Sequence, residues 1–263
     1  METGQLQDKN YTIDLQTLSN VKYSTPQFNK LEDFLLTELI YHGDTTTLFS
    51  GSFLGEPALV EVCTRIPFRV VCREIDILSD LKATDGIIKV KGCTRNPSIG
   101  VVTLALEPFD FRQWWHPIKI NDAFRLFRDL LRIVTELHAK NYFHGWICRS
   151  SVFVAEDLSH VTLGFFHAAA KVGKPAPIVF RRLGPIGERR ADDPRQEDVY
   201  DAALWFLSFL DGEPLRVLYE IHSTDLPPPL IALIESMGSS DPMNRPPAHQ
   251  CLEALNGIEF PEG

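Results

Sequence analysis

The stretch from 142 to 154 brings one histidine, one cysteine, one arginine and two serines close together in the chain. Histidine is the commonest general base in proteins, and serine and cysteine are common nucleophiles. Acid–base catalysis at His144 would need a nucleophile or a carboxylate directly beside it, and neither adjoins this residue. We therefore expect His144 to be a packed structural histidine and Trp146 to be an ordinary core aromatic residue.

Helices are expected before this stretch and farther along the chain after it, and they must position it. An amphipathic helical pattern precedes it, with Asn121 as the expected N-cap, and a short strand follows it directly. The later segment 199–210 is apolar almost all round, which is typical of a helix buried inside a domain. Two more helices are expected, one at 230–237 and a last one that reaches Leu255.

Upstream of Glu107 the pattern is mostly that of strands, which predicts an α+β fold. Residues 1–30 are polar and fit either a strap laid on the domain or a disordered tail, and their composition favours the tail. The expected elements after residue 30 are a hairpin from 34–40 and 47–53 around a turn at 42–44, strands at 58–63, 87–92 and 100–106, and a helix at 67–82.

The composition excludes several classes of protein. A net charge of -9 provides no attraction for nucleic acid, and an acidic membrane surface would repel the chain. The longest apolar run, 202–210, is too short to cross a bilayer, and the first residues do not form a secretory signal. At 263 residues the chain can bury one substantial core or two coupled lobes without a disulfide or a metal.

The cysteines indicate a reducing compartment. They are odd in number, scattered, and never spaced as a Cys-x-x-Cys pair, so packed thiols in a cytosolic or nuclear protein fit better than a disulfide framework or a zinc site. We therefore predict a cytoplasmic location and no bound metal. The five positions are Cys63, Cys72, Cys93, Cys148 and Cys251.

From about residue 31 to the end, the order of landmarks resembles that of protein kinases. The landmarks are Arg73–Leu78, Leu137–His138 with His144, Glu197–Tyr200, and Asp241-Pro242-x-x-Arg245-Pro246. The resemblance implies a bilobal fold with a five-stranded amino-terminal lobe containing one helix and a mainly helical carboxy-terminal lobe, meeting near 107–109. It also implies that Asp198 braces the backbone of the catalytic loop and that Arg245 pairs with an acidic residue, for which Glu188 is the candidate.

The loop itself is closest in style to one branch of that fold. The pattern His144-Gly145-x-Ile147-x-Arg149-Ser150-Ser151 resembles loops of the tyrosine-kinase-like branch. Mixed lineage kinase domain-like pseudokinases have a similar loop, and plant receptor-like pseudokinases share its style.

Every residue that performs phosphoryl transfer in that family is replaced here. The resemblance places Glu61 at the strand lysine, Trp146 at the catalytic aspartate and Ser151 at the metal-binding asparagine. The magnesium-binding aspartate becomes either Gly164 or Phe165, depending on a one-residue choice of register. Only one glycine of the phosphate-binding loop remains, and no nearby acidic residue replaces the lost ones.

Glu61 raises an electrostatic question, because the resemblance places it opposite Glu74. Two close carboxylates repel each other, so either the helix of Glu74 sits outward or an arginine or lysine bridges the pair. Glu74 could alternatively be an ordinary surface residue of its helix.

The nucleotide slot is expected to be filled. Leu59 replaces the usual small residue above the base, Phe153 replaces the usual leucine below it, and Leu106 is the expected gatekeeper. Larger side chains on both sides leave the base no volume, and overpacking is not relieved cheaply. We therefore expect no nucleotide and no cofactor.

These features predict a catalytically dead protein that works as a scaffold, regulator or decoy for a protein partner such as an active kinase. A nucleotide-sensing switch and an unorthodox transferase remain the alternatives. Trp114 and Trp115 follow the expected hinge in a run too rich in aromatics for one helix face, so they are the candidate partner-binding residues. In the competing interpretation both tryptophans pack into the carboxy-terminal lobe or against the amino-terminal strap, and 167–188 is the next candidate surface.

Overall fold

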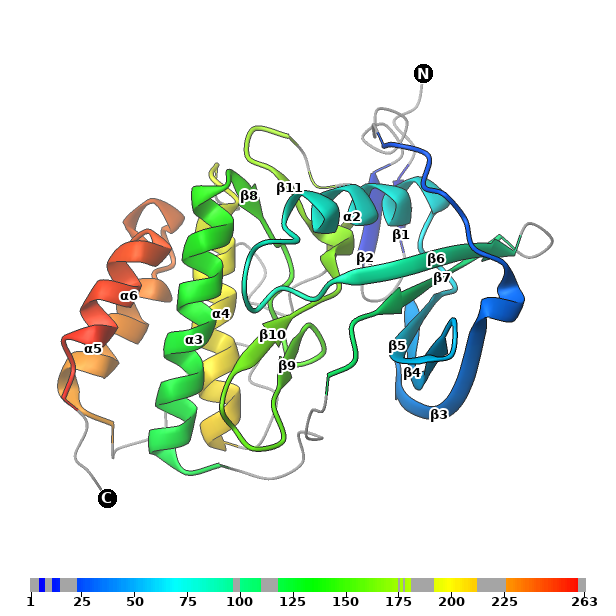
Figure 1. The fold of residues 1–263 in the computed structure, drawn as a ribbon. Coiled ribbons are helices and arrows are strands. Elements are labelled where there is room, and N and C mark those ends of the chain that lie inside the picture. The colour runs from blue at the N-terminus through cyan, green and yellow to red at the C-terminus, as the bar shows by residue number, and fades with distance from the viewer. Residues whose placement is uncertain are drawn as a thin grey trace.

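The structure is a computed structural model that describes residues 5–7, 11–14, 23–96, 100–109, 118–174, 176, 178–180, 192–211 and 226–259. Within these residues the chain has an α+β architecture. A five-stranded antiparallel sheet with one helix beside it lies at one end of the molecule, and four further helices lie at the other (Figure 1).

The sheet has the strand order β3-β4-β5-β7-β6. Its strands are β3 (Phe34–His42), β4 (Thr46–Phe53), β5 (Glu56–Cys63), β6 (Val90–Asn96) and β7 (Val101–Leu106). The predicted β3–β4 hairpin is confirmed. Between β4 and β5, Leu54 and Gly55 both have positive φ, at 53° and 84°, which is the backbone twist that a two-residue hairpin turn requires.

The start of β6 differs from the prediction. The sequence indicates a strand over 87–92 because Ile87 and Ile88 are apolar, but β6 begins at Val90 and ends at Asn96. Ile87 instead forms an isolated bridge with Leu163, and the Ile88 amide donates to the Leu163 carbonyl at 3.0 Å. The two isoleucines therefore join the sheet end of the molecule to the segment that follows residue 142.

Helix α2 (Phe68–Asp80) packs beside β6 and β7 (Figure 1). Its apolar residues recur at helical spacing, and the face they form is buried, including Val70, Val71 and Leu78. The same face carries Glu74 into the interior.

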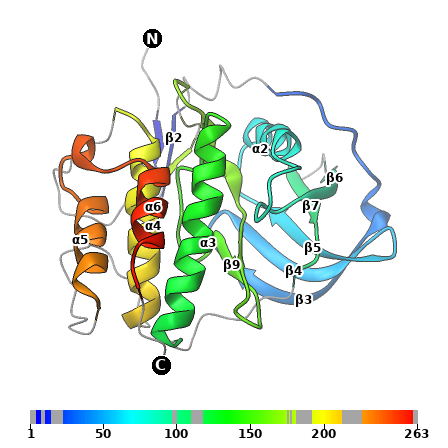
Figure 2. The same cartoon turned by 60° about the vertical axis from the view of Figure 1, so that its left-hand side comes forward.

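The other helices are α3 (Ile120–Ala139), α4 (Arg195–Asp211), α5 (Pro228–Met237) and α6 (Ala248–Asn256), which stand side by side (Figure 2). The stacked rings of Phe127 and Phe206, 4.5 Å apart, join α3 to α4 in the core. The prediction that Asn121 caps α3 is wrong. The helix begins one residue earlier, at Ile120, with Lys119 at the N-cap position and no side-chain cap hydrogen bond.

Short elements connect the two ends of the molecule. They are β8 (Tyr142–Phe143), β9 (Val152–Val154), β10 (Val161–Leu163), the 3-10 turn η2 (Phe166–Ala168) and β11 (Ala170–Lys171). The strand β9 pairs with β10, and β8 pairs with β11, each antiparallel. Together they carry the 142–154 stretch and the segment 161–168 to the same place, against α2 and β5.

Over the described residues 23–30, the N-terminal segment lies against the sheet end of the molecule as a strap, and not as the tail that its composition favours. The amide of Asn29 donates to the Cys93 carbonyl at 2.7 Å, and Thr94 Oγ1 donates to the Asn29 carbonyl at 2.8 Å. The rings of Tyr23 and Phe28 pack on Phe68. Farther upstream, β1 (Gln5–Gln7) and β2 (Tyr11–Asp14) form a three-stranded sheet with β12 (Ile178–Phe180).

Candidate functional site

One buried carboxylate of α4, that of Asp198, binds the backbone of the 142–154 stretch. Asp198 accepts the backbone amide of His144 at Oδ2 and that of Gly145 at Oδ1, both at 2.8 Å. His138 Nε2 lies 3.0 Å from the same Oδ2. Gly145 has a φ of 79°, and an added Cβ would lie 3.1 Å from the Ala168 carbonyl oxygen, so a glycine suits this position. The contact from Asp198 is the one that the resemblance implies.

His144 is fully buried and has a hydrogen-bond partner at each ring nitrogen. Nε2 donates to the Gly164 carbonyl at 2.9 Å, and Nδ1 accepts the Trp146 amide at 3.3 Å. Burial lowers the pKa of His144, because the charged imidazolium is poorly solvated there. A neutral, packed histidine agrees with the structural role expected from the sequence. Trp146 is half-buried and so less enclosed than the expected core residue.

Ser151 closes the turn of the loop. Its Oγ accepts the Cys148 amide at 2.9 Å and donates to the Trp146 carbonyl at 2.8 Å. Both bonds lie within the loop, and Ser151 is fully buried. The side chain at this position therefore serves the backbone of the loop. We name the set formed by His138, His144, Gly145, Ser151 and Asp198 the loop frame.

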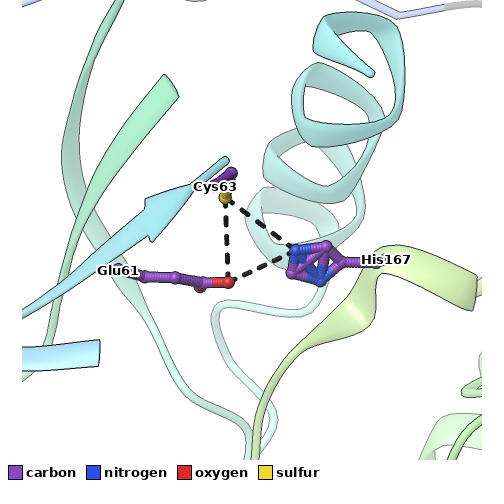
Figure 3. A group of neighbouring side chains, drawn as sticks. All are labelled: Glu61, Cys63 and His167. Atoms are coloured by element: carbon purple, nitrogen blue, oxygen red, sulfur yellow. Dashed lines mark hydrogen bonds and ion pairs between the residues drawn. The ribbon is translucent and has the colours of Figure 1, made fainter. Parts of the chain in front are cut away.

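A second group of buried polar side chains lies beside the loop frame, since Phe166, the residue before His167, packs on the ring of His144. Figure 3 shows three of its members, Glu61, Cys63 and His167. We name this group the buried cluster. It consists of Glu61 and Cys63 of β5, Glu74 of α2 and His167 of η2, each no more than 3% exposed. His167 Nε2 is the common neighbour. It lies 3.3 Å from Glu61 Oε1, 3.5 Å from Glu74 Oε2 and 3.9 Å from Cys63 Sγ.

Neither predicted arrangement of the two glutamates is correct. Helix α2 does not sit outward, and Glu74 is not a surface residue, since it is 1% exposed and its Oε1 accepts the Phe166 amide at 2.6 Å. The residue between Glu61 and Glu74 is a histidine, His167, and not an arginine or a lysine.

Burial determines the charge of this cluster. It raises the pKa of Glu61 well above its usual range, and the neighbouring Glu74 raises it further. Burial likewise raises the pKa of Glu74 to about 8 and lowers that of His167 to about 3. At neutral pH the two carboxyls therefore hold protons and the imidazole is neutral, because isolated charges are poorly solvated in the interior.

Aromatic side chains fill the space next to the cluster. An added Cβ on Gly164 would lie 2.7 Å from the ring of Phe153, so an aspartate does not fit there without displacing that ring. Phe165 has a left-handed backbone, with φ at 57°, and its ring lies between those of Tyr41 and Phe153. The Tyr41 side chain also hydrogen-bonds to Ser150. The sequence resemblance offers Gly164 or Phe165 as the position of a metal-binding aspartate. Both positions lie in this aromatic group.

The three residues expected to fill the nucleotide slot, Leu59, Leu106 and Phe153, are all buried. A cavity of about 320 Å³ nevertheless opens beside Leu59, at the lower end of the range for small-molecule sites. Its wall is formed by β3, β4 and β5 together with Phe109, and it includes the carboxylates of Glu38 and Glu156. Carboxylates on the wall disfavour a phosphate-bearing ligand.

Three predicted site residues, Trp114, Trp115 and Glu188, lie outside the described residues. Arg245 is buried, and its guanidinium has partners among the described residues. It donates to the Ser239 carbonyl at 2.9 Å, lies 3.6 Å from Glu197 Oε1, and stacks 4.5 Å above the ring of Tyr200.

Sequence reasoning missed two members of the buried cluster, Cys63 and His167. The period-2 alternation of a strand places Glu61 and Cys63 on one face, so that pair could have been found. The approach of His167 depends on tertiary packing, since it lies 104 residues from Cys63 in the chain.

No protein-family model matches the chain, and no curated protein is similar to it. Among the described residues, none of the helices combines the length and the apolar character needed to span a membrane.

Proposed function

We propose that this chain is a pseudokinase: a protein kinase-like, bilobal domain that catalyses no phosphoryl transfer and acts through its surfaces on a protein partner. One observation carries the proposal. A kinase pairs a strand lysine with a helix glutamate to hold the nucleotide phosphates. Here the corresponding strand and helix bring together Glu61 and Glu74, with His167 between them.

Three further features support the kinase-like part of the proposal. The five-stranded sheet and α2 precede the large helices, as the resemblance implies. The carboxylate of Asp198 holds the amides of His144 and Gly145 at the start of the loop. The loop and the segment after β10 meet beside α2, where the family has its catalytic and metal-binding segments.

The same geometry argues against catalysis. Phosphoryl transfer requires cations around the phosphates and a metal held by carboxylates. The side chains closest to the corresponding place are two carboxyls and an imidazole and not a lysine, and the position of the metal-binding aspartate is packed with Phe153 and Phe165. Among the described residues, this arrangement argues against both a nucleotide switch and a transferase that uses ATP.

A phosphoryl-transfer assay and a thermal shift assay test this proposal together. Radiolabelled ATP with magnesium or manganese and generic substrates should give background incorporation only. A ligand at about a hundred times its Kd stabilises a fold by about 2.7 kcal/mol, which for this size is a melting shift of roughly 5 to 10 °C. We expect millimolar Mg-ATP to leave the melting temperature unchanged. A saturable shift, or incorporation that disappears in Glu74→Ala, would contradict the proposal.

An apolar surface suits the proposed role in protein binding. Exposed leucines lie on the 3-10 turn η1 (Leu31–Asp33), on the sheet edge β3, and at the β4–β5 turn. An apolar patch of this kind on a soluble domain is typical of a protein contact. The exposed leucines are Leu31, Leu35, Leu36, Leu39 and Leu54.

The leucine patch is tested by comparing which proteins the wild type and its variants capture. Leu36→Ser combined with Leu39→Ser, two side chains on one face of the sheet edge, should abolish capture of the partner that the wild type recovers, while the melting temperature stays nearly unchanged. Met243→Ser, which removes an exposed apolar side chain on the helical end of the molecule, is the matched control and should keep the partner. Trp114→Ala and Trp115→Ala test the surface predicted from the sequence in the same assay. If only the tryptophan variants lose the partner, the leucine patch is wrong.

The cavity beside Leu59 favours a second candidate, a small-molecule sensor. Because Glu38 and Glu156 line it, the matching ligand is cationic rather than a nucleotide. A melting shift with amine-bearing compounds that disappears in Glu156→Gln would support this function.

A further inference from the structure

The buried cluster has the donor atoms of a metal site. A thiol, an imidazole nitrogen and a carboxylate oxygen, from Cys63, His167 and Glu61, all lie within 4.8 Å of one another. They come from β5 and η2, and Figure 3 shows the three side chains turned toward one point. Sulfur and nitrogen donors in a small set are the ligands that zinc prefers, whereas magnesium and calcium take oxygen donors.

The distances between the donors match a tetrahedral site. Zinc binds nitrogen and oxygen at about 2.0–2.1 Å and sulfur at about 2.3 Å, so tetrahedral ligand atoms lie about 3.3–3.6 Å from one another. His167 Nε2 lies 3.3 Å from Glu61 Oε1, 3.5 Å from Glu74 Oε2 and 3.9 Å from Cys63 Sγ. The Cys63 and Glu61 donors are 3.8 Å apart. Shifts of a few tenths of an ångström would close the distances among Glu61, Cys63 and His167 around one ion. Glu74 lies near His167 but outside the group whose donors are all within 4.8 Å of one another, so it would have to move farther.

A second, independent observation points to a ligand. Glu74 Oε2 is buried and has no hydrogen-bond partner, although it faces His167 Nε2. The other oxygen of this carboxyl accepts the Phe166 amide, which orients the group. A buried carboxyl oxygen without a partner is costly, and a cation would supply the interaction that it lacks.

We propose that Glu61, Cys63 and His167 bind one zinc ion in a closed, structural site and that Glu74 turns toward the ion as the fourth ligand. The site is closed because all four side chains are buried. On binding, the Cys63 thiol and the two carboxyls release their protons to solvent, and the two positive charges of the ion offset two of the three negative charges that result. The ion also joins β5, α2 and η2, which the chain brings together only through packing.

The first experiment measures metal in the wild-type chain, purified from zinc-supplemented cells with any polyhistidine tag removed. Mass spectrometry of the metal content should give about one zinc per chain. Removal with a chelator should lower the melting temperature, and zinc at about a hundred times its Kd should restore it by roughly 5 to 10 °C, while magnesium does not. Cobalt in place of zinc should give the absorption band of a thiolate-bound ion.

The second experiment identifies the ligands with a matched pair of variants. Cys63→Ser should lose the zinc and the cobalt–thiolate band. The matched control is Cys251→Ser, which makes the same change at a buried thiol of α6. Among the interactions described, this thiol contacts only the Pro246 carbonyl, at 3.6 Å. The control should keep the zinc and the cobalt–thiolate band. If Cys63→Ser does not fold, the cobalt spectrum and the chelator response of the wild type decide the matter.

Two outcomes would overturn the inference. One is a wild-type chain with no zinc and no melting response to added zinc. The other is zinc that binds without a cobalt–thiolate band, or that remains in Cys63→Ser, since the ion then lies elsewhere. Neither outcome bears on the proposed function, because the absence of phosphoryl transfer and the partner surface do not depend on the ion.

Discussion

The loop frame and the buried cluster are neighbours that solve the burial of polar groups in opposite ways. His144 of the frame packs edge-on against Phe166, and the residue after Phe166 in the chain is His167 of the cluster. In the frame, the carboxylate of Asp198 meets backbone amides that point at it. In the cluster, two carboxyls meet one imidazole and one thiol, and one carboxyl oxygen has no hydrogen-bond partner.

The difference shows which buried groups the fold itself requires. A carboxylate that satisfies two amides shapes the loop whether or not the loop does chemistry, so its loss would leave buried donors without partners. The cluster has too few donors for its acceptors, and it depends on protons or a cation to become neutral. Four experiments sharpen this contrast, and the first carries the largest expected effect.

Removal of the frame carboxylate should be severely destabilising. In Asp198→Ala the amides of His144 and Gly145 lose their acceptor inside the protein, and each buried unsatisfied donor costs about 1–3 kcal/mol. We expect urea unfolding to show a loss of about 3–5 kcal/mol. Asp122→Ala, which removes an ion pair at 3.0 Å from Arg125 near the surface, should cost less than about 1 kcal/mol. If both variants lost the same free energy of unfolding, the frame carboxylate would be no more important to the fold than a surface ion pair.

Raising the pH from about 6.5 to about 8 should weaken the cluster in the metal-free protein. Glu74 in the unfolded chain loses its proton near 4.5, whereas the folded protein holds it up to about 8. Below 6.5 the lowered pKa values of His144 and His167 act with the opposite sign, so the Glu74 effect shows between about 6.5 and 8, where the free energy of unfolding falls, as the pH rises, by on the order of 1 kcal/mol for each pH unit. With a chelator present, Glu74→Gln should flatten this slope. Glu253→Gln, at an exposed position of α6, should leave it as in the wild type.

Acid should weaken the frame, with the opposite sign. Burial lowers the pKa of His144 in the folded state, and the unfolded chain takes up this proton near 6.5. The unfolded state then binds more protons below that pH, so stability falls as the pH drops, by at most about 1.4 kcal/mol for each unit. Nuclear magnetic resonance of the imidazole should show that the pKa of His144 in the folded protein lies below 6.5. A ring that titrates at 6.5 would contradict the neutral, packed assignment.

Replacement of a cluster carboxyl by an apolar side chain should have the smallest effect. In chelator-treated protein, Glu61→Met removes a buried group that must hold a proton, and such replacements are often neutral or stabilising. We expect a change within about 1 kcal/mol, measured beside Asp198→Ala under the same conditions. A loss above about 3 kcal/mol would mean that Glu61 is as necessary to the fold as Asp198.

Much of the architecture could be predicted from periodicity. Apolar residues at helical spacing indicated α2 and α3, and the nearly all-apolar run indicated α4 as a buried helix. Boundaries were less predictable, because local rules compete with packing. Asn121 is a good capping residue, yet α3 begins before it, and Ile87 has strand character, yet it bridges to Leu163 instead of joining β6.

The polar N-terminal segment shows the same limit. Its composition resembles that of a disordered tail, since it contains few side chains that could form a core of their own. It is ordered over 23–30 because the edge strand β6 offers backbone partners at Cys93 and Thr94, and because Phe68 offers a ring to pack on. Composition cannot reveal such partners, since they belong to another part of the chain.

The sequence by itself determined which residues stand at the positions that the resemblance assigns to catalysis. The identities of Glu61, Trp146 and Ser151 do not depend on the conformation. At these positions the resemblance expects a lysine, an aspartate and an asparagine, respectively. Only the tertiary structure decided what Glu61 and Glu74 do there. His167 lies between them after a separation of more than ninety residues from either, and burial then determines which groups hold protons. Contact across such a separation depends on how β5, α2 and η2 pack, and desolvation exists only once they have packed.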